Sequence, residues 1–329
     1  MGLLVDGKWS ARRYDPKDTG GKFVRAETQW RDWVTSDGEP AEGHARGFRA
    51  EPGRYHLYVS FACPWAHRTL IFRKLKKLEN IISVSVVHHF LGGQGWTFLA
   101  EDGCTGDTLY GLDYLHQVYA RADPHYTGRA SVPVLWDRQA QTIVSNESSE
   151  IIRMLNSAFD EWGDASLDFY PPALRNEIDA INALVYPAIN NGVYRTGFAT
   201  KQEAYEEAFW ELFAALDGLE DRLSRQRYLV GGSITEADWR LFTTLVRFDP
   251  VYAGHFKCNL RRIADYPSLS NYLRDLYQAP GVADTVNMHH IKAHYYGSHE
   301  TINPTRIVPA GPEIDYLAPH DRGRFDRKA

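Results

Sequence analysis

The sequence predicts an α/β domain followed by an all-α domain, and two patterns support this. Between residues 53 and 160, segments in which every second residue is apolar are interspersed with segments whose apolar residues have helical spacing. After residue 160 the apolar residues have helical spacing throughout. A length of 329 residues leaves room for two hydrophobic cores. The net charge of −5 argues against nucleic acid as the main partner.

Residues 1–52 are polar, rich in Gly and Asp and without strong periodicity, so we expect an extended arm that lies over a domain. The first residues lack the basic region and apolar run of a signal peptide. No apolar run approaches the ~20 residues of a membrane span, which argues against a membrane partner. The three cysteines are widely spaced, which favours a reducing compartment over a disulfide framework. We therefore expect a cytoplasmic protein.

The first domain, expected over residues 53–160, opens with a strand because the residues from Arg54 to Phe61 alternate with a period of two. Pro64 can then open a helix at its first turn. Residues 81–88 are rich in β-branched side chains and predict a second strand. A strand, a helix and a strand within about 35 residues form a βαβ unit, so the two strands should be parallel.

A long insert with many Gly and Asp is expected over residues 89–130. Residues 131–137 then predict a strand with Pro133 near its start, and residues 142–144 a short strand that completes a hairpin. A helix should begin within residues 146–150. The resulting order, β-α-β-insert-β-β-α, is that of a thioredoxin-like domain.

The second domain, expected over residues 170–295, shows apolar residues at helical spacing. Thr235 and Asp238 form a capping box in which Asp replaces the usual Glu or Gln. The expected helices cover residues 174–181, 209–223, 235–248, 268–278 and 282–294. Residues 296–329 are rich in Pro and predict an irregular tail, whose charged end at residues 322–328 should be solvated.

Cys63 is the first candidate for chemistry, because it stands where the first strand gives way to a helix. The N–H groups and dipole of a helix N-terminus stabilise an anion. Such a cysteine can have its pKa lowered from roughly 8.5 to between about 3.5 and 7.5. The alternative is a buried, inert cysteine. Ala66 occupies the position of a second thioredoxin-type cysteine, so a mixed disulfide would need an outside thiol.

Two further motifs point to a peptide ligand. In a thioredoxin-like domain, a proline at the place of Pro133 often follows a cis bond, and the rigid turn exposes backbone groups of Val132. Ser148 and the helix N–H groups can donate hydrogen bonds to a carboxylate while Glu147 pairs with an ammonium group, although an ordinary N-cap is the alternative. Together with Cys63 these features suit a thiol peptide with a free amino acid end, and glutathione fits that description.

The chain resembles a cytosolic glutathione transferase with a catalytic cysteine. The features that carry this resemblance are the Cys-Pro-Trp-Ala sequence that starts at Cys63, the Val-Pro and Glu-Ser motifs and the all-α second domain. The resemblance narrows to the glutathionyl-hydroquinone reductases, the Xi class. The motifs that carry it are Gly95-Trp96-Thr97-Phe98, Gly128-Arg129-Ala130-Ser131-Val132-Pro133, Asn191-Gly192-Val193-Tyr194, His294-Tyr295-Tyr296-Gly297-Ser298-His299 and Ile302-Asn303-Pro304-Thr305.

The resemblance implies a glutathione-dependent reaction that serves quinone detoxification. The Cys63 thiolate attacks the thioether sulfur of an aromatic glutathionyl-hydroquinone, which gives a Cys63–glutathione mixed disulfide and the free hydroquinone. A second glutathione, the co-substrate, resolves the disulfide and leaves as oxidised glutathione. The family also implies a glutathione-transferase-type helical C-terminal domain and a homodimer formed through it.

The resemblance further implies roles for individual residues. Tyr194 is the expected proton donor to the departing ring. Tyr252 and Tyr295 are expected to lower the thiolate pKa by hydrogen bonds, with Tyr296 as the alternative to Tyr295 and simple packing as the alternative for each. The expected glutathione contacts are Trp96, Arg129, Ala130, Ser131, Val132, Glu147 and Ser148.

Two alternative functions stay open at this point. An omega-like transferase would reduce dehydroascorbate or mixed disulfides, but it is not expected to carry the long arm, the insert or the Tyr295-Tyr296 motif. A non-catalytic interaction module of the same fold is the other alternative. His290 and His294 are four residues apart without the acid of an HExxH motif, so no metal is expected. Cys104 and Cys258 are expected to be structural.

Overall fold

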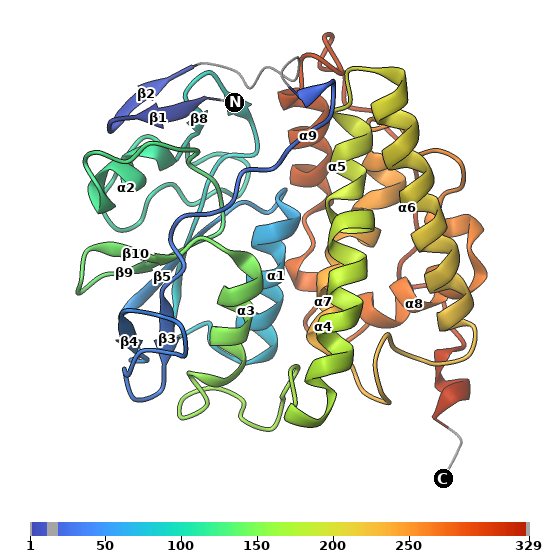
Figure 1. Ribbon diagram of the computed structural model, residues 1–329, viewed down its shortest axis with the longest axis horizontal. Coiled ribbons are helices and arrows are strands. Elements are labelled where there is room, and N and C mark those ends of the chain that lie inside the picture. The colour runs from blue at the N-terminus through green and yellow to red at the C-terminus, as the bar shows by residue number, and fades with distance from the viewer. Residues whose placement is uncertain (1, 12–18, 327–329) are drawn as a thin grey trace. The chain divides into compact units, whose positions relative to one another are not determined.

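The computed structural model describes residues 2–11 and 19–326, which form two compact units (Figure 1). The first unit comprises the described parts of Met1–Tyr14, Ala26–Leu167 and Thr285–Ser298, and the second those of Asp15–Arg25, Asp168–Asp284 and His299–Ala329. Parts of the predicted arm and tail, residues 1, 12–18 and 327–329, lie outside the described residues. The predicted domain boundaries stay predictions, and they differ from this division chiefly at residues 285–298, which lie in the first unit.

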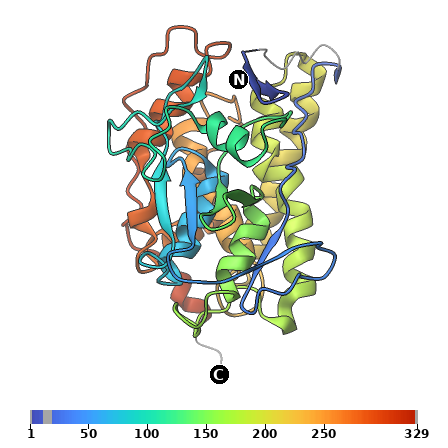
Figure 2. The same ribbon diagram turned by 90° about the vertical axis from the view of Figure 1, so that its left-hand side faces the viewer.

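A four-stranded mixed sheet forms the centre of the first unit, in the order β10-β9-β5-β6. Strand β5 (Tyr55–Val59) is parallel to β6 (Ser83–Val86), and both are visible side by side in Figure 2. On its other side β5 is antiparallel to β9 (Val134–Asp137), which forms a hairpin with β10 (Thr142–Ser145). All residues of β5 are buried, as a central strand covered on both faces requires. The predicted thioredoxin-like order is confirmed.

Besides a short helix in the insert, the described part of this unit contains three helices. Helix α1 (Pro64–Leu75) begins at the predicted proline and contacts α3 (Ser148–Ser157). The third is α9 (Met288–Ser298), which comes from the far end of the sequence and contacts β7. It belongs to this unit although its spacing had suggested the helical domain.

The insert and the arm hold more regular structure than their composition suggests. The insert contains β7 (Leu91–Gly92), β8 (Gly95–Trp96) and helix α2 (Leu115–Ala122). The arm contains an antiparallel pair, β1 (Leu3–Val5) with β2 (Lys8–Ser10), and a parallel pair, β3 (Trp33–Thr35) with β4 (Gly47–Arg49). Segments this short have no readable periodicity, so pairing with neighbours rather than local pattern determines them.

The second unit is helical. Its α-helices are α4 (Arg175–Val185), α5 (Gly192–Gly197), α6 (Gln202–Leu223), α7 (Glu236–Arg247) and α8 (Pro267–Tyr277). Single turns of other helix types occur in the chain at Pro172–Leu174, Tyr186–Asn190, Phe248–Tyr252, Ile263–Asp265, Ala283–Thr285 and Arg322–Phe325. Among the described residues, the helices lack the combination of length and apolar character that a membrane span requires.

The predicted capping box at the start of α7 is confirmed and has a wider role. The Asp238 carboxylate accepts a hydrogen bond from the Thr235 N–H at 2.8 Å. It also accepts bonds from the Leu229 N–H at 2.9 Å and from the Tyr272 hydroxyl at 2.7 Å. Because Asp238 is fully buried, these donors are what makes its burial tolerable. One carboxylate therefore joins the start of α7, the preceding loop and α8.

The expectation of a solvated charged end is wrong for Arg322, whose side chain is fully buried. Its guanidinium donates hydrogen bonds to the carbonyl oxygens of Leu223, Gln226 and Arg227 at 2.7, 2.6 and 2.5 Å. Carbonyl groups at the end of a helix such as α6 lack intrahelical partners and attract cations. The tail therefore caps α6.

Close packing in the second unit requires glycine at position 197. A Cβ atom added at Gly197, the last residue of α5, would lie 2.2 Å from Cγ of the buried Phe256 ring. A ring atom so near the backbone cannot yield without moving the whole side chain. In contrast, a Cβ at Gly218, within α6, would meet no atom within 4 Å.

We predict opposite effects for two alanine substitutions. Gly197→Ala should lower the free energy of unfolding by about 1–3 kcal/mol, because overpacking outweighs the gain in helix propensity. Gly218→Ala, the matched control, should raise it by about 0.5–1 kcal/mol. Urea denaturation followed by circular dichroism measures both changes. A stable Gly197→Ala chain would contradict the packing argument.

Candidate active site

Cys63 caps the N-terminus of α1, with extended backbone at φ −76° and ψ 122°. The turn after β5 is fixed by a hydrogen bond from the Cys63 N–H to the Ser60 carbonyl at 3.2 Å. No acidic side chain lies in the first turn of α1, so nothing there offsets its positive end. The side chain is partly exposed, and its Sγ lies 3.5 Å from the Val132 carbonyl oxygen.

The Val132–Pro133 peptide bond is cis, as predicted. It lies just before β9, so pairing of β9 with β5 brings this turn to the end of β5 where Cys63 stands. Val132 is buried, whereas Arg129, Ala130 and Ser131 before it are partly exposed. This partly exposed backbone segment lies beside the Cys63 thiol, so it is a suitable surface for binding a peptide that carries a thiol of its own.

Glu147 and Ser148 occupy the N-terminus of α3. One carboxylate oxygen of Glu147 accepts hydrogen bonds from the Ser149 N–H at 3.0 Å and the Ser149 hydroxyl at 2.8 Å. Glu147 is therefore an N-cap, the role weighed against ammonium binding in the sequence. The other oxygen lies 3.4 Å from the Thr28 hydroxyl. The Ser148 hydroxyl accepts a hydrogen bond of 3.3 Å from buried Arg68, a cation that sequence analysis missed.

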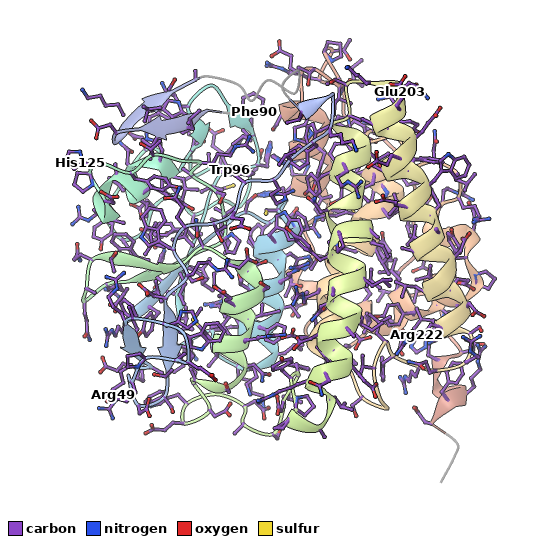
Figure 3. All side chains as sticks on the ribbon, viewed as in Figure 1. Arg49, Phe90, Trp96, His125, Glu203 and Arg222 are labelled. Atoms are coloured by element: carbon purple, nitrogen blue, oxygen red, sulfur yellow. The ribbon has the colours of Figure 1, made fainter. Side chains whose placement is uncertain are left out.

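Trp96, at the end of the β7–β8 hairpin, is held by α9. Its ring stacks on His294 with centroids 4.9 Å apart and 22° between planes (Trp96 is labelled in Figure 3). Nδ1 of His294 donates to the His89 carbonyl oxygen at 2.8 Å, which fixes the imidazole. Tyr295 follows directly and is 1% exposed. Helix α9 thus brings Tyr295 into the same unit as Cys63.

The structure divides the predicted site residues between its units. The second unit holds Tyr194, on α5, and Tyr252, whose ring centroids are 6.1 Å apart. The first unit holds the others, which are Cys63, Trp96, Arg129, Ala130, Ser131, Val132, Glu147, Ser148 and Tyr295.

Tyr194 has a cationic neighbour that the sequence did not reveal. The Arg25 guanidinium lies over the Tyr194 ring at 4.8 Å from its centroid, and Nε of Arg25 donates to Oδ1 of Asn191 at 3.0 Å. Tyr194 is 9% exposed, whereas Tyr252 is fully buried. Arg25 lies in the arm, some distance along the chain from every motif, so no local signal marks it.

The three cysteines are free thiols, and two of them are in apolar surroundings. Burial raises the pKa of the Cys104 thiol to about 11. Burial likewise raises the pKa of Cys258, which is fully enclosed. Both thiols are therefore protonated near neutral pH and are poor nucleophiles. Cys63 alone of the three stands at a helix start.

Histidines gather where α9 meets the insert. The ring of His290 donates from Nε2 to the Asp102 carbonyl oxygen at 2.6 Å. His88, His89 and Asp102 form the one group of described residues whose ligand atoms approach closely enough for a shared metal ion, within 4.8 Å. However, Nδ1 of His88 accepts the Phe90 N–H at 3.1 Å, which leaves the proton on Nε2. That nitrogen would have to lose its proton before it could bind a metal.

Comparisons with known proteins identify the family. Residues 62–158 match the family model of the glutathione S-transferase N-terminal domain, and residues 202–275 match that of the C-terminal domain. Glutathionyl-hydroquinone reductase YqjG of Escherichia coli is 58% identical over 98% of each chain. Glutathionyl-hydroquinone reductase PcpF of Sphingobium chlorophenolicum is 59% identical over 95% of this chain and 96% of its own.

Solved structures give the same result. The glutathione-bound structure of YqjG superposes with a TM-score of 0.90 at 55% identity, over 98% of this chain and 99% of the other. The Xi-class transferase of Natrialba magadii also gives 0.90, at 50% identity over 98% and 97% of the two chains. The chain therefore belongs to the glutathione transferase family, in the Xi class of glutathionyl-hydroquinone reductases.

Proposed function

We propose that this protein reduces glutathionyl-hydroquinones to hydroquinones at the expense of glutathione, with Cys63 as the nucleophile. The observation that carries the proposal is the position of the Cys63 thiol at the N-terminus of α1, 3.5 Å from the Val132 carbonyl. A helix N-terminus favours the thiolate, which is the reactive form. The names of the relatives at 58% and 59% identity support the substrate class.

Glutathione is the proposed co-substrate, and both ends of the site in the first unit suit it. The backbone of Val132 offers a peptide edge beside the thiol. The N–H groups at the start of α3 and the Ser148 hydroxyl can donate hydrogen bonds to the glutamyl carboxylate, with buried Arg68 adding positive charge behind Ser148. Trp96 and the segment from Arg129 to Ser131 are the further proposed contacts. The glutathione bound in the E. coli relative supports the choice of glutathione as the ligand.

The proposed chemistry has two displacements at sulfur. The Cys63 thiolate attacks the thioether sulfur of the substrate, the carbon–sulfur bond breaks, and its electron pair goes to the aromatic carbon, which takes up a proton. The products are the Cys63–glutathione disulfide and the hydroquinone. The thiolate of a second glutathione then attacks that disulfide, releasing oxidised glutathione and restoring the Cys63 thiolate.

In this scheme one tyrosine supplies a proton and two others stabilise the Cys63 thiolate. We assign the proton for the departing ring to Tyr194, with Arg25 over its ring favouring the phenolate that is left behind. Tyr252 and Tyr295 are the proposed hydrogen-bond donors to the thiolate. Both are almost completely enclosed, so a hydroxyl directed at an anion would meet little competition from water.

The setting of the reaction belongs to the same proposal. Free cysteines suit the reducing cytoplasm, where glutathione is abundant. Family membership supports a homodimer and a role in quinone detoxification without a metal. An omega-like reductase of dehydroascorbate is less well supported, because the relatives named glutathionyl-hydroquinone reductases are 58% and 59% identical to this chain, whereas those named omega-like transferases are 48%, 40% and 37% identical. A non-catalytic module is less well supported because Cys63, the Val132–Pro133 turn and the Glu147–Ser148 motif are all present.

We predict that Cys63→Ser lowers the rate of hydroquinone formation by at least about 100-fold, because a hydroxyl is far less acidic and less nucleophilic than a thiol. Glutathione binding should persist. Steady-state turnover and calorimetry measure the two properties. Cys104→Ala is the matched control and should keep full turnover, since that thiol is buried and protonated. Turnover surviving in Cys63→Ser would rule out the proposed nucleophile.

We predict that Tyr194→Phe slows release of hydroquinone in a single turnover by about 10²–10⁴-fold while the Kd for glutathione stays within twofold. The loss of the proton donor affects the first displacement only. Rapid quenching followed by chromatography measures the rate. The control is Tyr205→Phe, which removes a tyrosine hydroxyl from the same unit. That hydroxyl donates to the Lys257 carbonyl. Equal loss of rate and of glutathione affinity would instead indicate a structural role.

A further inference from the structure

The hydroxyl of Tyr119, on helix α2 of the insert, makes three hydrogen bonds. It donates to the Ser131 carbonyl oxygen at 2.7 Å. It accepts from the Ser131 N–H at 3.2 Å and from Nδ2 of Asn146 at 3.1 Å. A phenol has one donor and two lone pairs, so these bonds use its full capacity. Burial raises the pKa of Tyr119, so the hydroxyl keeps its proton.

The partners of this hydroxyl lie in the two segments to which glutathione binding is assigned. Ser131 directly precedes Val132, whose carbonyl is in contact with the Cys63 thiol. Asn146 directly precedes Glu147 and Ser148 at the start of α3. The two partners lie 12 and 27 residues from Tyr119 in the sequence. The hydroxyl oxygen of Tyr119 therefore links the segment at Ser131 to the segment at Asn146. Along the chain these two segments are connected through the β9–β10 hairpin.

The arm encloses this junction. The Trp30 ring packs edge-on against Tyr119, with centroids 5.3 Å apart and 80° between planes. The Trp30 carbonyl also accepts the Asn146 N–H at 3.1 Å. Near the start of the arm, Leu4 exchanges backbone hydrogen bonds of 2.8 and 3.0 Å with Gly128, which directly precedes Arg129. The arm and the insert thus brace the same two segments from outside.

We propose that Tyr119 is a positioning residue of the glutathione site, which sets the spacing between the Val132 backbone and the Glu147–Ser148 helix start. The inference rests on the proposed function, because it takes these two segments as the binding surfaces for one peptide. Its hydroxyl has no capacity left for a ligand, so it acts through Ser131 and Asn146. A ligand held at both segments is sensitive to a small change in their separation.

The test is the affinity for glutathione of a Tyr119→Phe variant, measured by calorimetry. We expect Kd and KM for glutathione to rise about tenfold, because removal of the hydroxyl leaves its partners in Ser131 and Asn146 without these hydrogen bonds. The maximal rate at saturating glutathione should stay within about threefold, since Cys63 and its helix are untouched. This division between KM and kcat separates a positioning role from general loss of structure.

A matched control is available in the same unit. Tyr55 is also fully buried, and its hydroxyl donates to the Arg49 carbonyl at 2.5 Å, away from both segments. Tyr55→Phe should lower the unfolding midpoint much as Tyr119→Phe does, yet leave Kd within twofold.

Asn146→Ala removes one bond of the junction and serves if Tyr119→Phe does not fold. It should raise Kd several-fold, and its effect should not add to that of Tyr119→Phe.

The outcomes are distinct. A rise in Kd for Tyr119→Phe but not for Tyr55→Phe supports the positioning role. An unchanged Kd in Tyr119→Phe and Asn146→Ala overturns it, as does an equal rise in Tyr55→Phe. A wild-type chain that does not bind glutathione at all would refute the proposed function itself, and the inference with it.

Discussion

The contact between the Cys63 thiol and the Val132 carbonyl depends on one strand pairing, that of β5 with β9. Tyr58 pairs with Val134 in this register, so the chain leaves β5 toward Cys63 at the end where the cis Val132–Pro133 turn enters β9. A shift of this register by one residue would turn every side chain to the other face and separate the thiol from the turn. The proposed nucleophile and the proposed glutathione-binding turn are therefore placed by the core of the first unit.

Segments remote in sequence converge on this end of the sheet. The arm pairs with Gly128 and bonds to Asn146, helix α2 supplies Tyr119, and α9 places His294 on Trp96. Each attachment uses hydrogen bonds to backbone groups or ring stacking, so the segments order a surface that the thioredoxin-like core alone would leave as loops. The arm, the insert and helix α9 thus contribute to the candidate site as well as to the fold.

Local patterns were sufficient for much of the fold. Alternation over β5, the proline that opens α1 and the capping box at Thr235 could all be read because each depends on residues adjacent in sequence. The unit to which α9 belongs and the burial of Arg322 could not, because both depend on long-range partners. The candidate nucleophile was identified from its place before a helix. Tyr119, one of nineteen tyrosines, has no distinguishing pattern and is revealed only by its contacts.

The most direct test of the central claim is a single turnover followed by mass spectrometry. The pure protein is mixed with a glutathionyl-hydroquinone in the absence of free glutathione, and the intact chain and its peptides are then weighed. Attack of the thiolate on the thioether sulfur predicts one glutathione on Cys63 and one equivalent of free hydroquinone. A chain without an adduct, in a mixture without hydroquinone, would contradict the account.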